Sequence, residues 1–374
     1  PASRSTPSPS SPAWPTDSSA PQLLSKLVVN RKSIVSWCLY DFANSFYVAV
    51  VPATIWSAYY AGTIVGNQQG YGDLWWGRAV SLSMAFVALT SPLAGGLADF
   101  AGVRKRLLLL YTLVSATGTC LLAMVAPGMV LWGFALSVLA NIGFEGAQVF
   151  YNAYLPEIAP RDHQGRVSGW GFATGYAGSV VGLLLALPFA QRGLYGMIFV
   201  TIGICYLLFS IPAFLWLPAD VRAALSVRQA AIGGVETMVA TLREILRLPE
   251  LRRFLLAYLI FEDGVVTVIS FSSIFAFTTL GFAMAQLIWL FLIVQVSALV
   301  GALLWAKPTD RLGPRFVVLA MLGQWSLVVA AAYFIQTQTQ FFVLATLAGT
   351  GLGAIQAASR AYMCTLIPHG REAE

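Results

Sequence analysis

The chain has 374 residues, of which 58% are hydrophobic and only 10% are charged, and its mean hydropathy is +0.74. A water-soluble globular protein carries about 25% charged residues, so this composition excludes that class. The net charge of +6 comes from cationic residues between apolar segments, which is typical of membrane-protein loops and gives no reason to expect a nucleic-acid partner.

The apolar segments predict membrane-spanning helices. Residues 1–33 come first and include a Ser- and Pro-rich stretch, which we expect to be a disordered N-terminal tail. Ten apolar runs follow, and each is about 20 residues or longer, enough to cross a hydrocarbon core of about 30 Å as an α-helix. The predicted spans are 34–60, 74–98, 105–126, 129–154, 168–190, 195–217, 252–278, 283–306, 316–335 and 341–366. The fold class is therefore all-α, in a polytopic membrane protein.

The cationic residues predict the orientation of these spans. If the N-terminus is cytoplasmic, nearly all of the 22 Lys and Arg residues fall in the tail and in the even-numbered connections. Only Arg78, Arg192 and Arg360 fall outside this set. This asymmetry follows the positive-inside rule, so we expect a cytoplasmic N-terminus.

An internal repeat predicts the architecture. Two short connections carry the pattern Asp-x-x-Gly-x-Arg. The pattern comprises Asp99, Gly102 and Arg104 after the second span, and Asp310, Gly313 and Arg315 after the eighth. Weaker echoes relate the segment from Tyr154 to the segment from Tyr362, and Asp41 to Asp263. Two halves with the same inside-outside sense form a parallel repeat.

The repeat divides the chain into an N-terminal half at 34–217 and a C-terminal half at 251–374. Residues 218–250 form a polar linker, in which apolar residues at helical spacing predict a short amphipathic helix on the cytoplasmic membrane surface. The second half holds four of the six helices that the repeat requires, so we expect two spans to be missing.

Several motifs resemble a known family. The Asp-x-x-Gly-x-Arg loop resembles the signature loop of the major facilitator superfamily, whose fold has two pseudo-symmetric six-helix halves. A narrower resemblance rests on four motifs: Trp37-Cys-Leu-Tyr-Asp41-Phe-Ala-Asn44, Phe150-Tyr-Asn152-Ala-Tyr-Leu-Pro-Glu157, Asp263-Gly-Val and Ile367-Pro-His-Gly-Arg371. Together they resemble the vacuole-effluxer (autophagy-related 22-like) branch in its compact prokaryotic form.

The resemblance implies secondary-active transport of a small polar solute by alternating access. Amino acids are the favoured solutes, since fungal members of the branch are associated with amino acid export from the vacuole. The implied location is the plasma (inner) membrane, or the vacuolar membrane for a fungal protein. We expect lipid, the solute and protons to be the partners of a monomer.

The fold also implies that spans one, four, seven and ten line a central cavity. Span four places Asn141, Glu145, Gln148 and Asn152 on one helix face. A carboxylate near mid-membrane costs about 3 kcal/mol unless it meets water, a proton or a partner. Glu145 is therefore a candidate proton carrier or ligand for a solute cation. The alternative is a structural role, in which Glu145 pairs with a basic residue or belongs to a packed polar network.

Spans one and ten add further candidates. Asp41, Asn44 and Tyr47 share one face of span one, where Asp41 is either a binding residue or part of a cytoplasmic gate. Gln356 and Arg360 lie in span ten. Arg360 could hold a solute carboxylate with two hydrogen bonds, or could simply extend from a helix end to the interface.

Span seven carries two adjacent carboxylates, Glu262 and Asp263, followed by Thr267. Adjacent residues point about 100° apart on a helix, so at most one of the two faces the cavity squarely. The repeat favours Asp263, and Glu262 would then reach the interface or pair with a basic residue.

The repeated Asp-x-x-Gly-x-Arg loops are candidate gates between the two halves. An Asp beside Arg residues at a helix end can form ion pairs between the halves in one state and release them in another. Positive-inside topology alone explains Arg104 and Arg315 but not the repeated Asp and Gly.

Other functions find less support in the sequence. The four Cys residues fall inside predicted spans, no predicted span contains a His, and no set of residues has metal-ligand spacing, so we expect no metal, no cofactor and no enzymatic activity. A membrane sensor or scaffold built on a transporter fold is the alternative function. Finally, the spacing of Gly171, Gly175, Gly178 and Gly182 in span five predicts a helix-packing face.

Overall fold

The computed structural model describes residues 31–159, 161–220 and 246–366, with isolated residues between 233 and 243. This part of the chain is helical and contains no strand. Ten of its helices are long and apolar enough to cross a membrane, which confirms the predicted spans. Residues 1–30 of the predicted N-terminal tail and most of the predicted surface helix lie outside the described residues, whereas residues 31–33 belong to the first helix.

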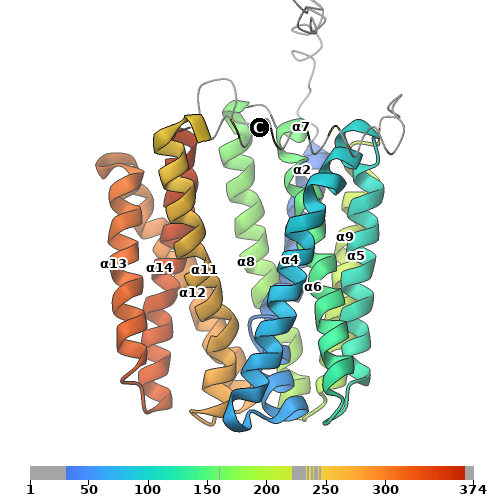
Figure 1. Cartoon of the computed structure of the whole chain (residues 1–374), viewed down its shortest axis with the longest axis vertical. Coiled ribbons are helices and arrows are strands. Elements are labelled where there is room, and N and C mark those ends of the chain that lie inside the picture. Colours follow the sequence, from blue (N-terminus) through green and yellow to red (C-terminus); the bar gives the residue numbers. More distant parts are fainter. Residues whose placement is uncertain are drawn as a thin grey trace, which may run out of the picture.

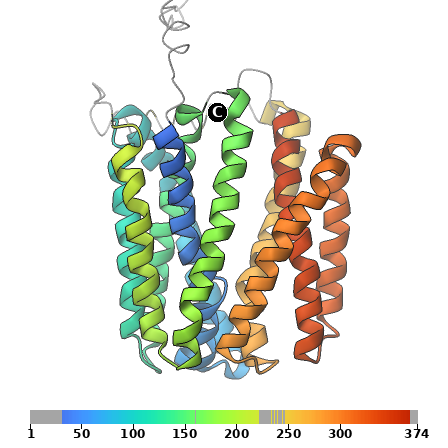
Figure 2. The same ribbon diagram turned by 180° about the vertical axis from the view of Figure 1, so that it is seen from behind.

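The helices form two groups that follow the two halves of the sequence. The first group contains α2 (Arg31–Val50), α3 (Ile55–Tyr59), η1 (Tyr60–Gly66), η2 (Gln68–Gly70), α4 (Tyr71–Phe100), α5 (Arg104–Leu121), η3 (Leu122–Met124), α6 (Val130–Asn152), α7 (Leu155–Ile158), α8 (Arg161–Gln191) and α9 (Tyr195–Trp216). The second contains α11 (Pro249–Thr278), α12 (Met284–Leu312), α13 (Pro314–Ala332) and α14 (Gln338–Leu366). Figures 1 and 2 show the long helices running along one common direction, with α11 to α14 together on one side.

The first span is not one continuous helix. Pro52 has no backbone N–H and cannot continue the hydrogen-bond ladder of α2. The Ala53 N–H bonds instead to the Val48 carbonyl oxygen at 3.2 Å, and the Ser57 N–H bonds to the Val51 carbonyl oxygen at 3.2 Å. The span therefore ends in the short helix α3 and the π-helical segment η1, which form the end of the molecule away from Arg31.

Both copies of the Asp-x-x-Gly-x-Arg pattern place a glycine with positive φ between two helices. Gly102 has φ +61° and follows α4, whereas Gly313 has φ +87° and follows α12. This backbone conformation is readily available only to glycine, so the repeated Gly is explained by the turn. The next helix begins within two residues in both halves, at Arg104 in α5 and at Pro314 in α13.

The predicted glycine face of α8 packs directly on α2. A Cβ atom at Gly178 would lie 2.2 Å from the Phe42 carbonyl oxygen, and one at Gly182 would lie 2.7 Å from the Phe46 ring. A glycine also allows close packing of α14 on α12, because a Cβ atom at Gly353 would lie 1.9 Å from the Ala298 carbonyl oxygen. Small residues thus allow backbones to approach closely, as is common between membrane helices.

The halves meet at the end of the molecule formed by α3 and η1. The hydroxyl oxygens of Ser57 in α3 and Ser273 in α11 lie 2.8 Å apart, in a hydrogen bond that links the two halves. Next to it, Gly62 leaves room for the Phe277 ring, which a Cβ atom would approach to 2.5 Å. The two halves are also in contact where α8 packs against α12. The two halves also line the cavity described next.

Candidate functional site

A cavity of about 300 Å³ lies between the two halves. Its walls come from α2, α6 and α8 of the first half and from α11, α12 and α14 of the second. The polar residues that line it are Asp41, Asn44, Ser45, Gln148, Tyr176, Ser179, Gln295 and Gln356. Four of the predicted pathway residues, Asp41, Asn44, Gln148 and Gln356, therefore face one common space.

Asp41 is the carboxylate that lines this cavity. The Asn44 side-chain nitrogen donates a hydrogen bond to its Oδ1 at 3.3 Å. Its Oδ2 faces α8 at two glycines, since Cβ atoms at Gly171 and Gly175 would lie 3.5 and 3.1 Å from it. The carboxylate also interacts electrostatically with Arg360 of the second half. The glycine face of α8 thus allows a charged group to lie between packed helices.

The other candidates on α2 and α6 are not in the cavity wall. Asn141 donates to the Ser83 hydroxyl at 2.7 Å and accepts from the Tyr47 hydroxyl at 3.4 Å, which ties α2, α4 and α6 together. Glu145 lies one turn further along α6 and interacts electrostatically with Tyr47. Within the described part of the chain, no group donates a hydrogen bond to the Glu145 carboxylate. Asn152 is exposed at the end of α6.

In the second half, Glu262 is the carboxylate that makes a contact across helices. Its Oε1 accepts a hydrogen bond from the Gln356 side-chain nitrogen at 2.9 Å, and it interacts electrostatically with Arg360. Asp263 points about 100° away from Glu262 around the axis of α11, and its side chain is exposed. Its backbone oxygen accepts a hydrogen bond from the Thr267 hydroxyl at 2.7 Å. The sequence repeat favours Asp263 as the inward residue, whereas the structure brings Glu262 to α14.

Arg360 joins the two halves beside the cavity. Its guanidinium carbon lies 3.6 Å from the centre of the Phe172 ring on α8. Phe172 and Tyr176, which both line the cavity, come from a helix that the family resemblance does not place among the lining spans. Gln295 on α12 is a further lining residue that sequence reasoning missed. Its position in the middle of an apolar span is the signal that could have revealed it.

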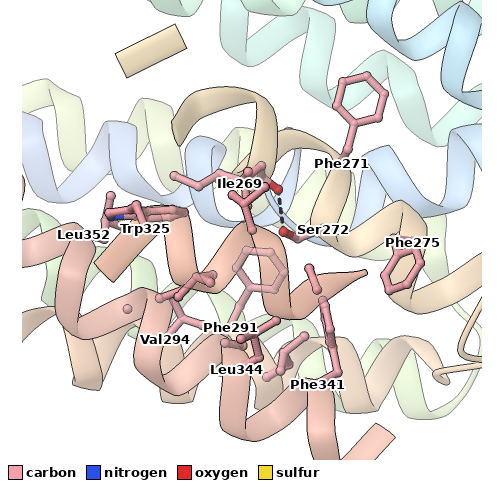
Figure 3. Close-up of a pocket in the computed structure, with 18 residues that line it drawn as sticks. Ile269, Phe271, Ser272, Phe275, Phe291, Val294, Trp325, Phe341, Leu344 and Leu352 are labelled. Carbon is pink, nitrogen blue, oxygen red and sulfur yellow. Dashed lines mark hydrogen bonds between the residues drawn. The ribbon is translucent and has the colours of Figure 1, made fainter. Parts of the chain in front are cut away.

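A second cavity lies next to the first and is almost entirely apolar. It has a volume of about 240 Å³ and is formed by α11 to α14 (Figure 3). The two cavities share the lining residues Ile269, Phe291, Val294 and Leu352. The hydroxyl of Ser272, one of the few polar groups in its wall, donates to the Val268 carbonyl oxygen. This cavity can take an apolar group but offers nothing to balance a charge.

The predicted gating residues lie at the end of the molecule opposite α3. Arg104 bonds to the Glu157 carboxylate at 2.8 Å and to the Ala153 carbonyl oxygen at 3.3 Å. In the second half Arg315 is exposed. The repeat matches Glu157 to Thr365, so that half has no carboxylate at the equivalent position. The side chains of Asp99 and Asp310 lie outside the described residues.

Asp220 is a further residue at this end that sequence reasoning missed. Its carboxylate oxygens accept hydrogen bonds from the backbone N–H groups of Lys105 at 2.7 Å and Arg106 at 3.3 Å. These N–H groups belong to the first turn of α5, so Asp220 caps that helix from the segment after α9. The Lys105 ammonium completes the connection by donating to the Leu217 carbonyl oxygen at 2.8 Å.

Comparisons with known proteins agree with this architecture. Residues 78–374 match the family model described as vacuole effluxer Atg22 like. The uncharacterized MFS-type transporter YxiO of Bacillus subtilis is 28% identical over 345 residues, which cover 89% of this chain and 80% of that protein. Autophagy-related protein 22 of Yarrowia lipolytica is 22% identical over 78% of this chain and 65% of that protein.

A solved structure supports the fold independently. The crystal structure of a point mutant of the nucleoside transporter NupG superposes with a TM-score of 0.64 at 14% identity, over 88% of this chain and 82% of that one. At this identity the likeness shows the fold and not the solute. The chain therefore belongs to the vacuole effluxer Atg22-like family, a family of MFS-type transporters, and is an integral membrane protein that crosses the bilayer several times.

Proposed function

We propose that the protein is a secondary-active transporter that moves a small polar solute across the membrane by alternating access, with amino acids as the favoured solutes. The observation that carries this proposal is the cavity of about 300 Å³ between the halves, in which Asp41 and several amide groups face one space. This volume lies at the lower end of the ~300–1,000 Å³ range of ligand cavities, which suits a small solute. A sensor or scaffold on the same fold would not need such a polar lining.

Amino acids are favoured because the site offers both signs of charge. Asp41 and Glu262 can balance an ammonium group, and Arg360 beside them can bind a carboxylate. The apolar cavity that shares a wall with the site could receive an apolar solute side chain. The family name, vacuole effluxer, supports export as the direction of transport.

Proton coupling is the second part of the proposal, and Asp41 and Glu145 are the proposed proton sites. A carboxylate within a membrane is stable only when it binds a proton, a cation or hydrogen-bond donors. Asp41 has one long hydrogen bond at 3.3 Å, and Glu145 has none among the described groups. Both are therefore suited to exchange a proton for another interaction during transport.

The loops at the end opposite α3 are the proposed gate. Arg104 and Glu157 form an ion pair there at 2.8 Å, and Asp220 holds the first turn of α5 beside them. We propose that Asp99 and Arg104, with their counterparts Asp310 and Arg315, form and release ion pairs as the halves move, while Gly102 and Gly313 provide the turns between the helices. This end is the predicted cytoplasmic side.

The test is uptake into proteoliposomes. We expect one class within a panel of labelled amino acids to accumulate only when a pH gradient is imposed. Glu145→Gln should abolish this gradient-driven accumulation and retain exchange of the solute, because the variant cannot bind or release a proton. Glu250→Gln is the matched control, since Glu250 is exposed and pairs with Arg253 outside the cavity.

Two results would contradict the proposal separately. Unchanged gradient-driven accumulation by Glu145→Gln would remove Glu145 from the proton pathway. Absence of uptake for every amino acid in the panel would remove that solute class and leave other small polar solutes to be tested.

A further inference from the structure

The contact between Arg360 and Phe172 is unusually close. The guanidinium carbon lies 3.6 Å from the ring centre, whereas Arg78 over Trp75 and Arg104 over Tyr154 lie at 5.5 and 5.3 Å. A cation is attracted to an aromatic face within about 6 Å, and 3.6 Å is direct stacking. The contact also joins α14 of one half to α8 of the other, beside the cavity that Phe172 lines. A cation of the protein itself thus stacks on an aromatic residue of the cavity wall.

The groups around this contact are those that bind organic cations. Asp41 and Tyr176 line the same cavity as Phe172, and the Asp41 carboxylate interacts electrostatically with Arg360. A carboxylate and two aromatic rings in one cavity wall form an arrangement that recognises ammonium groups.

We infer that Asp41, Phe172 and Tyr176 form a subsite for an ammonium or guanidinium group of the solute, and that Arg360 occupies this subsite when no solute is bound. The inference rests on the proposed function, in that the solute passes through this cavity. It deepens that function, because it requires a solute with a cationic group and excludes uncharged solutes such as sugars.

Arg360 is suited to leave the subsite when a solute arrives. Its long side chain can move while its charge stays fixed, and a guanidinium released from Phe172 can bind a carboxylate with two parallel hydrogen bonds. A solute ammonium would then take over the contacts with Asp41 and Phe172, while Arg360 would bind the solute carboxylate. A zwitterion adds no net charge, so the charge balance of the site stays the same. The subsite therefore favours solutes that carry an ammonium and a carboxylate together.

The test is binding of methylguanidinium to a variant that lacks the internal cation. In Arg360→Ala the subsite is vacant, so we expect methylguanidinium to bind the purified protein at least tenfold more tightly than it binds the wild type. Binding is measured by isothermal titration calorimetry in detergent. Adding Asp41→Asn or Phe172→Leu to Arg360→Ala should weaken binding about tenfold or more, as expected when a desolvated ionic or cation–π contact is lost.

Arg78→Ala is the matched control, because it removes an arginine from an aromatic ring outside the cavity and should gain no binding. The inference is overturned if Arg360→Ala binds methylguanidinium no more tightly than Arg78→Ala, or if Asp41→Asn leaves the binding unchanged. Arg360→Met, which retains an unbranched side chain, provides the same test if Arg360→Ala does not fold. Transport without this binding would refute the subsite alone, whereas binding without transport of any solute would refute the proposed function alone.

Discussion

The close packing of α8 on α2 gives a quantitative prediction for Gly178→Ala. The added Cβ atom would lie 2.2 Å from the Phe42 carbonyl oxygen and 2.9 Å from its carbonyl carbon. Cβ contacts in proteins are essentially never shorter than 3.0 Å, so the two helices must separate by roughly 1 Å. Both contacting groups are fixed to backbone, and no rotamer change can relieve the overlap. Such overpacking lowers the free energy of unfolding by about 1–3 kcal/mol, and we expect a loss at the upper end of that range.

Alanine also has a higher helix propensity than glycine, which stabilises the helix by about 1 kcal/mol. The net loss in the free energy of unfolding is therefore roughly 2 kcal/mol. Thermal unfolding in detergent, followed by circular dichroism, measures the effect as a lowered midpoint. Gly323→Ala is the control, because a Cβ atom there meets nothing within 4 Å and should leave the midpoint unchanged or raise it. Equal midpoints for the two variants would refute the argument that backbone contact at Gly178 sets the distance between α2 and α8.

Two further predictions concern charged groups. Asp220→Ala should lower the unfolding midpoint by a few degrees, since removal of a charged helix cap costs about 1 kcal/mol, whereas Arg106→Ala should have little effect because Asp220 still caps α5. An equal effect of the two substitutions would contradict the capping role. Glu262→Gln should reduce the rate of solute uptake at least fivefold more than Asp263→Asn, because Glu262 contacts Gln356 and interacts with Arg360. The reverse order would support the residue that the sequence repeat favours.

The fold was largely predictable because long apolar runs and loop charges are local properties of the sequence. Ten spans follow from hydropathy, and Gly102 and Gly313 in the repeated pattern indicate a turn in each half. Pro52 lacks a backbone N–H and therefore indicates a distortion of the first span, although many membrane helices continue through a proline. Its consequence, the short helix α3 that contacts the other half, depends on tertiary packing.

The site was predictable only in part. The helix faces of spans one, four and ten predict polar residues on a shared surface, and Asp41, Asn44, Gln148 and Gln356 line one cavity in the structure. The contribution of Phe172 could not be inferred, since an aromatic residue in an apolar span has no distinguishing signal. The choice between Glu262 and Asp263 depends on the rotation of α11 relative to α14, which a repeat in the sequence does not determine.

The hydrogen bond between Ser57 and Ser273 has a consequence for how the protein responds to its surroundings. This end of the path is closed by a neutral hydroxyl pair and by an aromatic ring against Gly62, so neither dissolved ions nor acidity should alter its strength. At the opposite end, the ion pair between Arg104 and Glu157 weakens in salt, but both residues belong to the first half and the pair does not join the halves. We therefore expect the contact between the halves near α3 to be insensitive to the salt concentration and the acidity of the solution that it faces.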